Sequence, residues 1–467
     1  MRVRPQTGLE IDGFTLGEML HKGGFATIWE VTHPDHPGPM VMKVPTILDG
    51  DDGPTIVGFE VEQMILPRLT GPHVPRVVAS GDFARMPYLV TERLPGASLH
   101  GLFDTAPLPV ADVVVLGRRM AAMVHALHGQ HVIHLDLKPA NLMARAGGEL
   151  VAIDFGLARH DQLPDLLAEE FAIPMGTYPY IAPEQFLRQR DDLRSDIFAL
   201  GAMLYQLATG RLPFGQPERL RGVRRRLWRD PEPPRALNPE IPAWLQEIIL
   251  RALEVDPADR TQTAAQMLFD LEHPDQVELT HRARKERRDG LWTVARRRWR
   301  MSRLRGFAPP PPLIAAQASR APVLMAAVDL SPDMESLSER ILQAVRDQLA
   351  VRPGARVACV NVIRTHRIGI DMATDEAGNH IHIARLVALK AWGAQLGLPE
   401  GRVTFTVLDG PDPAAVLIEH AGRIRADHVL MGARAHSATR RYLGSVSSQV
   451  VAEAHCSVTI VRIPAAG

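Results

Sequence analysis

Residues 14–31 alternate between hydrophobic and polar positions, a pattern that predicts paired β-strands. Over residues 14–31 the alternation is punctuated by glycines, which is typical of a strand, a turn and a second strand. Two more apolar runs follow at 40–44 and 88–94, and the first contains a single charged residue, Lys43. The period then changes to that of a helix over residues 110–130, which predicts a long buried helix.

A second patterned region covers residues 321–467. Strand-like runs at 323–329, 356–363, 402–408, 428–431 and 456–463 are separated by helical patterns. Strands that alternate with helices predict a parallel sheet with helices on both faces. Ligands of such sheets bind beyond the carboxyl ends of the strands.

The stretch between these regions, residues 273–320, is expected to be a linker. Lys and Arg residues crowd its middle, Trp292 and Trp299 are interleaved with them, and prolines at 309–312 stiffen the chain. A basic amphipathic segment could lie on an anionic membrane surface or bind nucleic acid. We favour a helix packed on the first folded region with its arginines in solvent, because the tryptophans need burial somewhere.

Composition limits the class of protein. The chain has 467 residues, too many for one ordinary core, and no apolar run in it reaches membrane-spanning length. Its formal net charge is zero, so there is no strong case for nucleic acid as a partner. Cys359 and Cys456 lie far apart, which argues against a disulfide scaffold, and the N-terminus has no apolar signal core. These features predict a cytoplasmic protein.

The candidate chemistry is concentrated at residues 134–141, which read HLDLKPAN. Asp136, Lys138 and Asn141 lie at short spacings there, and Asp154 begins an Asp-Phe-Gly triplet shortly afterwards. Two carboxylates and an amide that converge on one point would form a metal–phosphate site, in which the lysine offsets charge on a moving phosphoryl group. The alternative is a surface turn with scattered charges.

On these motifs, residues 10–272 resemble the protein kinases, and among them the bacterial serine/threonine kinases. The resemblance implies a bilobal fold, with an N-lobe over residues 10–93 and a C-lobe over 94–272. It implies that Asp136 orients the substrate hydroxyl and that Lys138 contacts the γ-phosphate of ATP. Asn141 and Asp154 would then hold Mg²⁺ or Mn²⁺.

The same resemblance implies an ATP site in the N-lobe. Lys43 would contact the α- and β-phosphates and pair with a helix carboxylate, placed at Glu62 because the alternative, Glu60, would spoil the helical register. The glycine-rich loop matches poorly, since only its middle glycine, Gly23, is present, with Gly24 beside it. The other positions implied to surround ATP are Ile28, Val41, the gatekeeper Thr91, and the hinge residues Glu92 and Leu94.

The segment after the Asp-Phe-Gly triplet, residues 157–175, departs from most kinases. It contains no Ser, Thr or Tyr, and Leu135 replaces the arginine that commonly binds a phosphorylated residue there. We therefore expect the acidic residues of this segment to meet neighbouring basic groups, without control by phosphorylation. Three further contacts are implied by the resemblance: Thr177 with Asp136 and Lys138, Asp196 with the catalytic-loop backbone, and Glu184 with Arg260.

Residues 321–467 resemble the universal stress protein family. The matching stretches are AAVDLSP, MGARAHSATRRYLGSVSSQVV and SVTIVR, and they imply a five-stranded parallel sheet of flavodoxin-like or Rossmann-like type. A nucleotide site here would use Asp329, Gly432, Gly444 and Ser445, although Ala435 replaces one glycine of the family pattern. The alternative is a helix N-cap and nothing more. The last strand is expected at a sheet edge, where it would pair with a second copy.

The combined prediction is a multidomain α+β and α/β protein, namely an ATP-dependent serine/threonine kinase that acts on proteins. Its C-terminal domain would regulate or dimerise it. One alternative is a pseudokinase scaffold that binds nucleotide without transfer, which the poor glycine loop favours. The other is a stress adaptor anchored through its basic linker. The intact set of Lys43, Glu62, Asp136, Lys138, Asn141 and Asp154 favours the active kinase.

Overall fold

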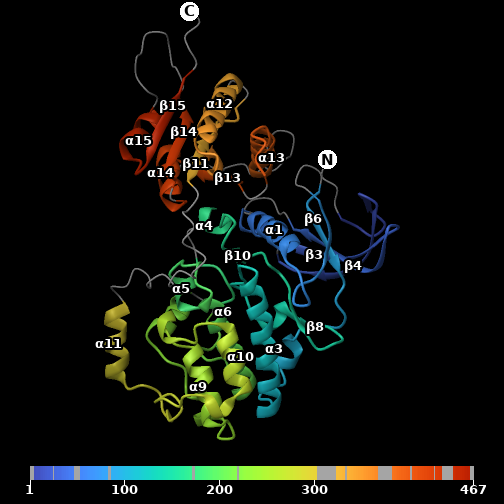
Figure 1. The fold of residues 1–467 in the computed structure, drawn as a ribbon, viewed down its shortest axis with the longest axis vertical. Coiled ribbons are helices and arrows are strands. Elements are labelled where there is room, and N and C mark those ends of the chain that lie inside the picture. Colours follow the sequence, from blue (N-terminus) through green and yellow to red (C-terminus); the bar gives the residue numbers. More distant parts are fainter. Residues whose placement is uncertain are drawn as a thin grey trace, which may run out of the picture.

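The computed structural model describes residues 5–24, 26–46, 53–81, 86–170, 174–217, 220–301, 322–331, 334–365, 381–399, 402–424, 426–433 and 445–462. Within these ranges the chain forms two lobes, and a C-terminal domain that lies beside the helix and strands of the first lobe (Figure 1).

The first lobe is an antiparallel sheet with one helix, α1 (Gly53–Ile65), packed against it. The strands are β1 (Glu10–Ile11), β2 (Phe14–Lys22), β3 (Ala26–His33), β4 (His36–Pro45), β5 (Val77–Gly81) and β6 (Tyr88–Glu92), in the order β1-β2-β3-β4-β6-β5. The β2–β3 hairpin confirms the strand–turn–strand prediction. Ile28 lies opposite Lys43, and Val41 lies opposite Thr91, so four predicted ATP-site residues share three neighbouring strands.

The second lobe is mainly helical and surrounds the catalytic segment. Its long helices are α3 (Val110–Gly129), α6 (Arg194–Thr209), α9 (Ala243–Ala252) and α10 (Ala264–Glu272). Its shorter elements are α2 (His100–Phe103), β7 (Val132–Ile133), β8 (Leu142–Ala144), β9 (Leu150–Ala152), β10 (Arg159–His160), α4 (Leu166–Glu170), α5 (Pro183–Phe186), α7 (Leu220–Val223) and α8 (Pro234–Leu237). Helix α3 confirms the long buried helix that the periodicity predicts, because one of its faces is completely buried.

A buried ion pair joins two distant parts of this lobe. Arg260 makes two hydrogen bonds to the Glu184 carboxylate, at 2.7 and 2.6 Å, and both side chains are almost completely buried. The predicted pair is therefore present. Removing one partner of such a pair is strongly destabilising, by roughly 3–5 kcal/mol, because a charge is left buried alone.

The C-terminal domain is a parallel sheet covered on both faces. Its strands are β11 (Val323–Ala327), β12 (Arg356–Arg364), β13 (Val403–Gly410), β14 (His428–Gly432) and β15 (Ser457–Val461), in the order β13-β12-β11-β14-β15. Helices α12 (Glu335–Val351) and α13 (Ile381–Ala394) share one core with Leu324 and Ala326. Helices α14 (Pro413–Arg423) and α15 (Ser445–Glu453) share the other with Met325 and Ala327. Strand β15 lies at a sheet edge, as predicted.

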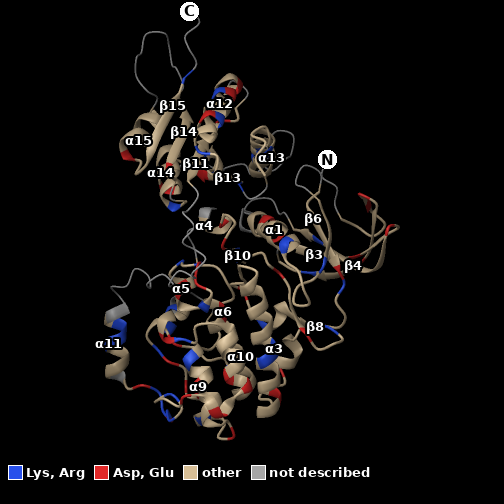
Figure 2. Ribbon diagram, viewed as in Figure 1, with Lys and Arg blue, Asp and Glu red and all other residues tan. Residues whose placement is uncertain are grey.

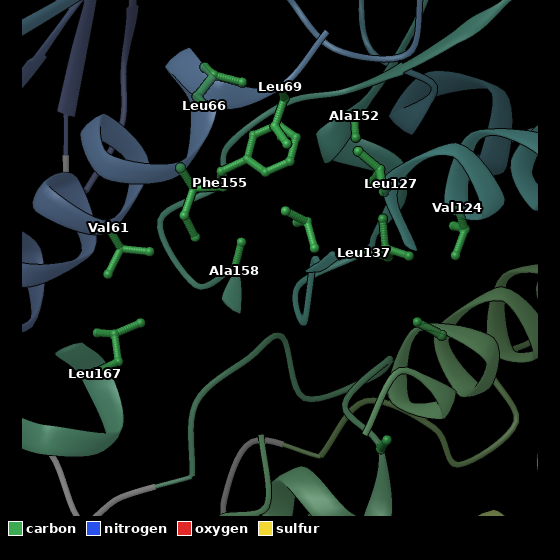
Figure 3. Packing of buried hydrophobic residues seen from close by; sticks show 14 of the residues in the cluster. Val61, Leu66, Leu69, Val124, Leu127, Leu137, Ala152, Phe155, Ala158 and Leu167 are labelled. Carbon is green, nitrogen blue, oxygen red and sulfur yellow. The ribbon is translucent and has the colours of Figure 1, made fainter. Parts of the chain in front are cut away.

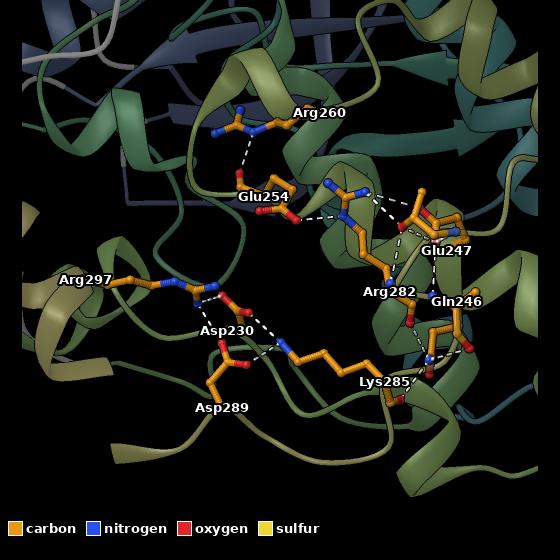
Figure 4. Close-up of polar contacts among 11 residues, drawn as sticks. Asp230, Gln246, Glu247, Glu254, Arg260, Arg282, Lys285, Asp289 and Arg297 are labelled. Carbon is orange, nitrogen blue, oxygen red and sulfur yellow. Dashed lines mark hydrogen bonds and ion pairs between the residues drawn. The ribbon is translucent and has the colours of Figure 1, made fainter. Parts of the chain in front are cut away.

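The basic linker is held to the second lobe by ion pairs, but its tryptophans are not buried. Lys285 and Arg297 both contact Asp230 and Asp289 at 2.6–3.0 Å, which attaches helix α11 (Leu291–Met301) to the lobe (Figure 4). The prediction of a packed helix is therefore confirmed. Its reason was wrong, since Trp292 is 89% and Trp299 is 61% exposed. The ion pairs, together with Arg298 over the Trp228 ring at 5.7 Å, make the attachment.

Candidate active site

A cluster of three charged side chains lies between the two lobes. The Lys43 ammonium on β4 contacts Glu62 Oε2 at 2.5 Å and Asp154 Oδ1 at 2.8 Å. Glu62 Oε1 also accepts a hydrogen bond from the backbone N–H of Phe155 at 3.3 Å. One carboxylate on α1 therefore connects the N-lobe lysine to the Asp-Phe-Gly loop. Glu62, rather than Glu60, is the partner of Lys43, as the helical register predicts.

This cluster sets the charge of the candidate metal ligand. The Lys43 ammonium lowers the pKa of Asp154 to about 2, so its carboxylate is ionised at neutral pH. Burial alone would lower the pKa of Lys43, but its two carboxylate partners raise that pKa above the usual value. Nearby, Asn141 Nδ2 donates hydrogen bonds to the backbone oxygen and Oδ2 of Asp136, at 3.0 and 3.2 Å. The amide oxygen of Asn141 is then the atom that it can offer to a cation.

The donor set fits a divalent ion that is shared with phosphate. Magnesium is usually held by one or two protein oxygens together with substrate phosphates. Asp154 and Asn141 supply a carboxylate and an amide oxygen of this kind. Within the described ranges, no group of three or more His, Cys, Asp or Glu side chains is arranged to hold a metal ion by itself. The residues therefore suit a metal that arrives with a phosphorylated ligand.

Asp136 is held by the side chains that surround it. Lys138 Nζ contacts its Oδ2 at 2.7 Å, and the Thr177 hydroxyl donates to its Oδ1 at 2.6 Å. Lys138 also donates to the Thr177 hydroxyl at 3.0 Å. The Asp136 carboxylate and the Lys138 ammonium thus both contact the Thr177 hydroxyl. The contacts predicted for Thr177 are therefore present.

The backbone around Asp136 adopts a conformation that has to be held in place. Leu135 has φ +61° and Asp154 has φ +65°, the left-handed region that side chains other than glycine seldom adopt. Asp196 Oδ1 and Oδ2 accept hydrogen bonds from the N–H groups of Leu135 and His134, each at 2.9 Å. Gln185 Nε2 donates to the Leu135 carbonyl at 2.7 Å. Asp196 therefore holds the catalytic-loop backbone, as predicted.

Helix α1 and the Asp-Phe-Gly loop touch through two glycines. A Cβ added to Gly58 would lie 3.2 Å from the Gly156 carbonyl oxygen, and one added to Gly156 would lie 3.3 Å from the Gly58 carbonyl oxygen. A side chain at either position would require the helix and the loop to shift by a few tenths of an ångström. Phe155 then packs beside Leu66 and Leu69 at the end of the helix (Figure 3).

On the side of the cleft where ATP is predicted to bind, two contacts position the chain. The N–H of Gly23 bonds to the Ala26 carbonyl at 2.9 Å, which closes the tip of the β2–β3 hairpin, and Gly24 follows at the turn. At the hinge, Arg145 Nη2 contacts Glu92 Oε1 at 2.5 Å, which ties β6 to the second lobe. Arg145 was not predicted from the sequence, and it pulls the Glu92 pKa below its usual value. Leu94 is buried beyond the hinge.

The segment after the triplet is held by an ion pair. Arg190 Nε contacts both oxygens of Asp165, at 3.1 and 3.0 Å, and its Nη2 donates to the Leu157 carbonyl at 3.0 Å. Leu135, at the position of the missing arginine, is buried. The expectation that acidic residues of the segment meet basic groups is met at Asp165. Arg190 itself was missed, because an arginine among other charged residues carries no positional signal.

A second missed residue supports the turn that contains Thr177. Arg226 is buried, and its guanidinium donates to the carbonyl oxygens of Tyr178, at 2.5 Å, and Ile181. It also lies over the Phe214 ring at 5.2 Å, and burial lowers its pKa to about 10. In the sequence Arg226 ends a run of three arginines that looks like solvated surface. Nothing in that pattern distinguishes it.

In the C-terminal domain the predicted nucleotide residues do not all meet. A hollow of about 720 Å³ lies beyond the carboxyl ends of β12 and β13, lined by Arg364, Thr365, Pro411, Asp412, Pro413, Ala414, Ser445, Val446 and Gln449. Ser445 is therefore at a cavity, but Asp329 and Gly432 are not among its lining residues. Asp329 Oδ1 accepts two hydrogen bonds from Ser331, and a Cβ on Gly432 would collide with Leu337. Gly444 and Ala435 lie outside the described residues.

Comparison with known proteins agrees with this geometry. The family model of the protein kinase domain matches residues 14–271, more than half of the chain, and that of the universal stress protein family matches residues 323–462. The chain is 30% identical over 215 residues to a probable serine/threonine-protein kinase of Clostridium perfringens, covering 46% of this chain and 31% of that protein. It is 29% identical over 265 residues to the serine/threonine-protein kinase PknB of Mycobacterium tuberculosis, covering 56% of this chain and 42% of that protein.

The chain thus spans less than half the length of these curated relatives. Among solved structures, the kinase domain of Mycobacterium tuberculosis PknI is matched over 58% of this chain and 99% of that one, at 23% identity and a TM-score of 0.45. The two family matches coincide with the two-lobed region and with the parallel-sheet region. The chain belongs to the protein kinase family and carries, after its kinase domain, a domain of the universal stress protein family.

Proposed function

We propose that this chain is an ATP-dependent serine/threonine kinase that transfers the γ-phosphate to hydroxyl groups of protein substrates. In this proposal residues 10–272 form the catalytic domain, residues 273–320 the linker, and residues 321–467 a regulatory or dimerising domain. The observation that carries it is the charged cluster of Lys43, Glu62 and Asp154, formed at hydrogen-bonding distance beside Asp136 and Lys138. A chain that no longer transferred phosphate would not be expected to retain all of these residues.

Each residue has a role that its surroundings support. Lys43, aligned by Glu62, would hold the α- and β-phosphates, while the backbone near Gly23 and Gly24 and the side chains of Ile28, Val41, Thr91, Glu92 and Leu94 would enclose the nucleotide. Asp154 and Asn141 would hold Mg²⁺, or Mn²⁺, which neutralises charge on the phosphates when bound. Asp136 would orient the attacking hydroxyl and accept its proton, and Lys138 would offset charge on the transferred group.

The first prediction separates hydroxyl orientation from nucleotide binding. Asp136→Asn should lower the transfer rate by at least about 100-fold, because the proton-accepting carboxylate is lost. It should leave ATP affinity unchanged. Asp154→Asn should weaken metal-dependent ATP binding as well, because a metal ligand is lost. Transfer to a peptide and nucleotide binding by calorimetry measure the two effects.

Asp275→Asn, an exposed carboxamide substitution outside the cleft, is the matched control and should change neither quantity. Wild-type transfer by Asp136→Asn would show that the role of Asp136 is wrongly assigned. ATP binding without any transfer by the unmodified chain would favour the pseudokinase alternative.

The second prediction concerns activation. Arg190 pairs with Asp165 inside a segment that contains no Ser, Thr or Tyr, so phosphatase treatment should change peptide phosphorylation by less than about tenfold, or roughly 1.4 kcal/mol. Asp165→Asn, which removes the ion pair, should lower the rate more than phosphatase does. A larger loss on dephosphorylation, at whichever hydroxyl of the kinase domain it maps, would overturn this proposal.

We also propose that the chain dimerises through its C-terminal domain. Strand β15 lies at the sheet edge, and no other strand in the described part of the chain pairs with its outer side, which would allow pairing with a second copy. Sedimentation of the full chain should give a dimer, and amide exchange at residues 457–461 should slow as the dimer forms. A monomer at high micromolar concentration would count against this arrangement.

An anionic membrane surface is a further proposed partner. Trp292 and Trp299 are seven residues apart, on one face of α11, and both are exposed. The exposed Arg224 and Arg225 belong to the turn that contacts that helix, and Figure 2 shows arginines of α11 in blue. Indole rings between basic groups suit a lipid headgroup layer. None of the described helices is long and apolar enough to cross a membrane.

Co-sedimentation with vesicles that contain phosphatidylglycerol tests this partner. Trp292→Ser should weaken binding by about tenfold, or roughly 1.4 kcal/mol. Val351→Ser, an exposed apolar position in the C-terminal domain, should have no effect. Salt-sensitive binding to DNA, without binding to vesicles, would identify nucleic acid as the partner instead.

A further inference from the structure

Helix α1 carries two carboxylates that point in opposite directions. Glu60 and Glu62 are two residues apart, about 200° around a helix of 3.6 residues per turn. Glu62 faces the cleft and pairs with Lys43. Glu60 faces the other way and pairs with Lys390, on helix α13 of the C-terminal domain. The helix that aligns the ATP-binding lysine is therefore also joined to the second domain.

The surroundings of α1 are unusually apolar. Ile56, Val57, Phe59 and Val61 are each at most 4% exposed, although these residues cover more than one face of the helix. A helix with apolar residues on more than one face needs cover on each of those faces. In Figure 1 the sheet of the N-lobe lies on one side of α1, and α13 and α4 lie near it on others.

Helix α4, from the segment after the Asp-Phe-Gly triplet, lies between the two domains. It packs against α1 on one side and against β13 and α14 of the C-terminal domain on the other. Leu167, 1% exposed, lies opposite Val61 of α1 (Figure 3). The buried side chains of α1 and α4 and those of α13 belong to one continuous apolar cluster. The C-terminal domain thus contacts both α1 and the segment after the Asp-Phe-Gly triplet.

From these contacts we propose that the C-terminal domain holds α1 in its catalytic position, with Glu60 and Lys390 acting as positioning residues. This inference rests on the proposed kinase function, and it specifies how that function is controlled. Docking of the domain keeps Glu62 on Lys43, and undocking frees α1 and α4 together. Because Gly58 touches Gly156, movement of α1 also displaces the loop that carries Asp154.

Charge supports a direct role for the pair. The Glu60 side chain is 9% exposed, and Lys390 is 38% exposed. A carboxylate that is so well buried strongly favours a position next to a cation. Replacing Lys390 with a carboxylate would place two like charges together at the interface, and the simplest relief is separation of the domains.

The test uses the full chain and three variants: Lys390→Glu, Glu60→Lys and the double variant that exchanges the two charges. Lys390→Glu should speed amide exchange over residues 53–65 and lower kcat/KM for peptide phosphorylation, within the 5–150-fold range typical of coupled sites. The double variant should restore both. Arg340→Glu, an exposed charge reversal on α12 of the same domain, is the matched control and should change neither.

The two readouts separate this inference from the kinase proposal. Amide exchange needs no catalysis, so faster exchange in α1 with full recovery in the double variant supports the contact even if the chain transfers no phosphate. Unchanged exchange and unchanged kcat/KM in Lys390→Glu would overturn the inference. A loss that the double variant does not recover, with normal exchange in β11 and β12 showing an intact domain, would overturn it as well.

Discussion

The requirement to pair one half-buried lysine organises the kinase domain of this protein. Lys43 lies on the central part of the N-lobe sheet, where an uncompensated ammonium would be costly. Its two partners come from different elements, Glu62 from α1 and Asp154 from the loop after β9. Satisfying one charge therefore fixes the helix, the sheet and the Asp-Phe-Gly loop relative to each other. The cleft exists in this form because these three elements meet there.

The sequence was most informative where chemistry imposes residue type and spacing together. Asp136, Lys138, Asn141 and Asp154 stood out as candidates because a metal–phosphate site needs acidic, basic and amide groups close along the chain. The parallel sheet could also be predicted, because five strand-like runs separated by helical patterns follow one another along the chain. The order of its strands and the assignment of helices to faces depend on tertiary packing, and the pattern does not contain them.

The residues that could not be foreseen form contacts between distant segments. Arg190, Arg226 and Lys390 look like ordinary surface cations in the sequence, yet each contacts a specific acidic group or carbonyl. Trp292 shows the opposite error, since a large aromatic ring was expected to be buried and is exposed. The close approach of the Leu337 side chain to Gly432 is likewise a tertiary contact that the sequence pattern did not indicate. The environment of each of these residues depends on which parts of the folded chain come together. The local sequence pattern does not encode those tertiary contacts.

The glycine contact between α1 and the Asp-Phe-Gly loop has a consequence for small molecules. Gly58 and Gly156 meet backbone to backbone, so no side chain can turn aside to make room there. A compound that enters behind Thr91 and widens the space beside the loop has to move α1. In the proposed arrangement, the docked C-terminal domain would resist this movement of α1. Inhibitor and domain would then compete for the same helix, and by reciprocity a tighter domain interface would appear as a weaker inhibitor.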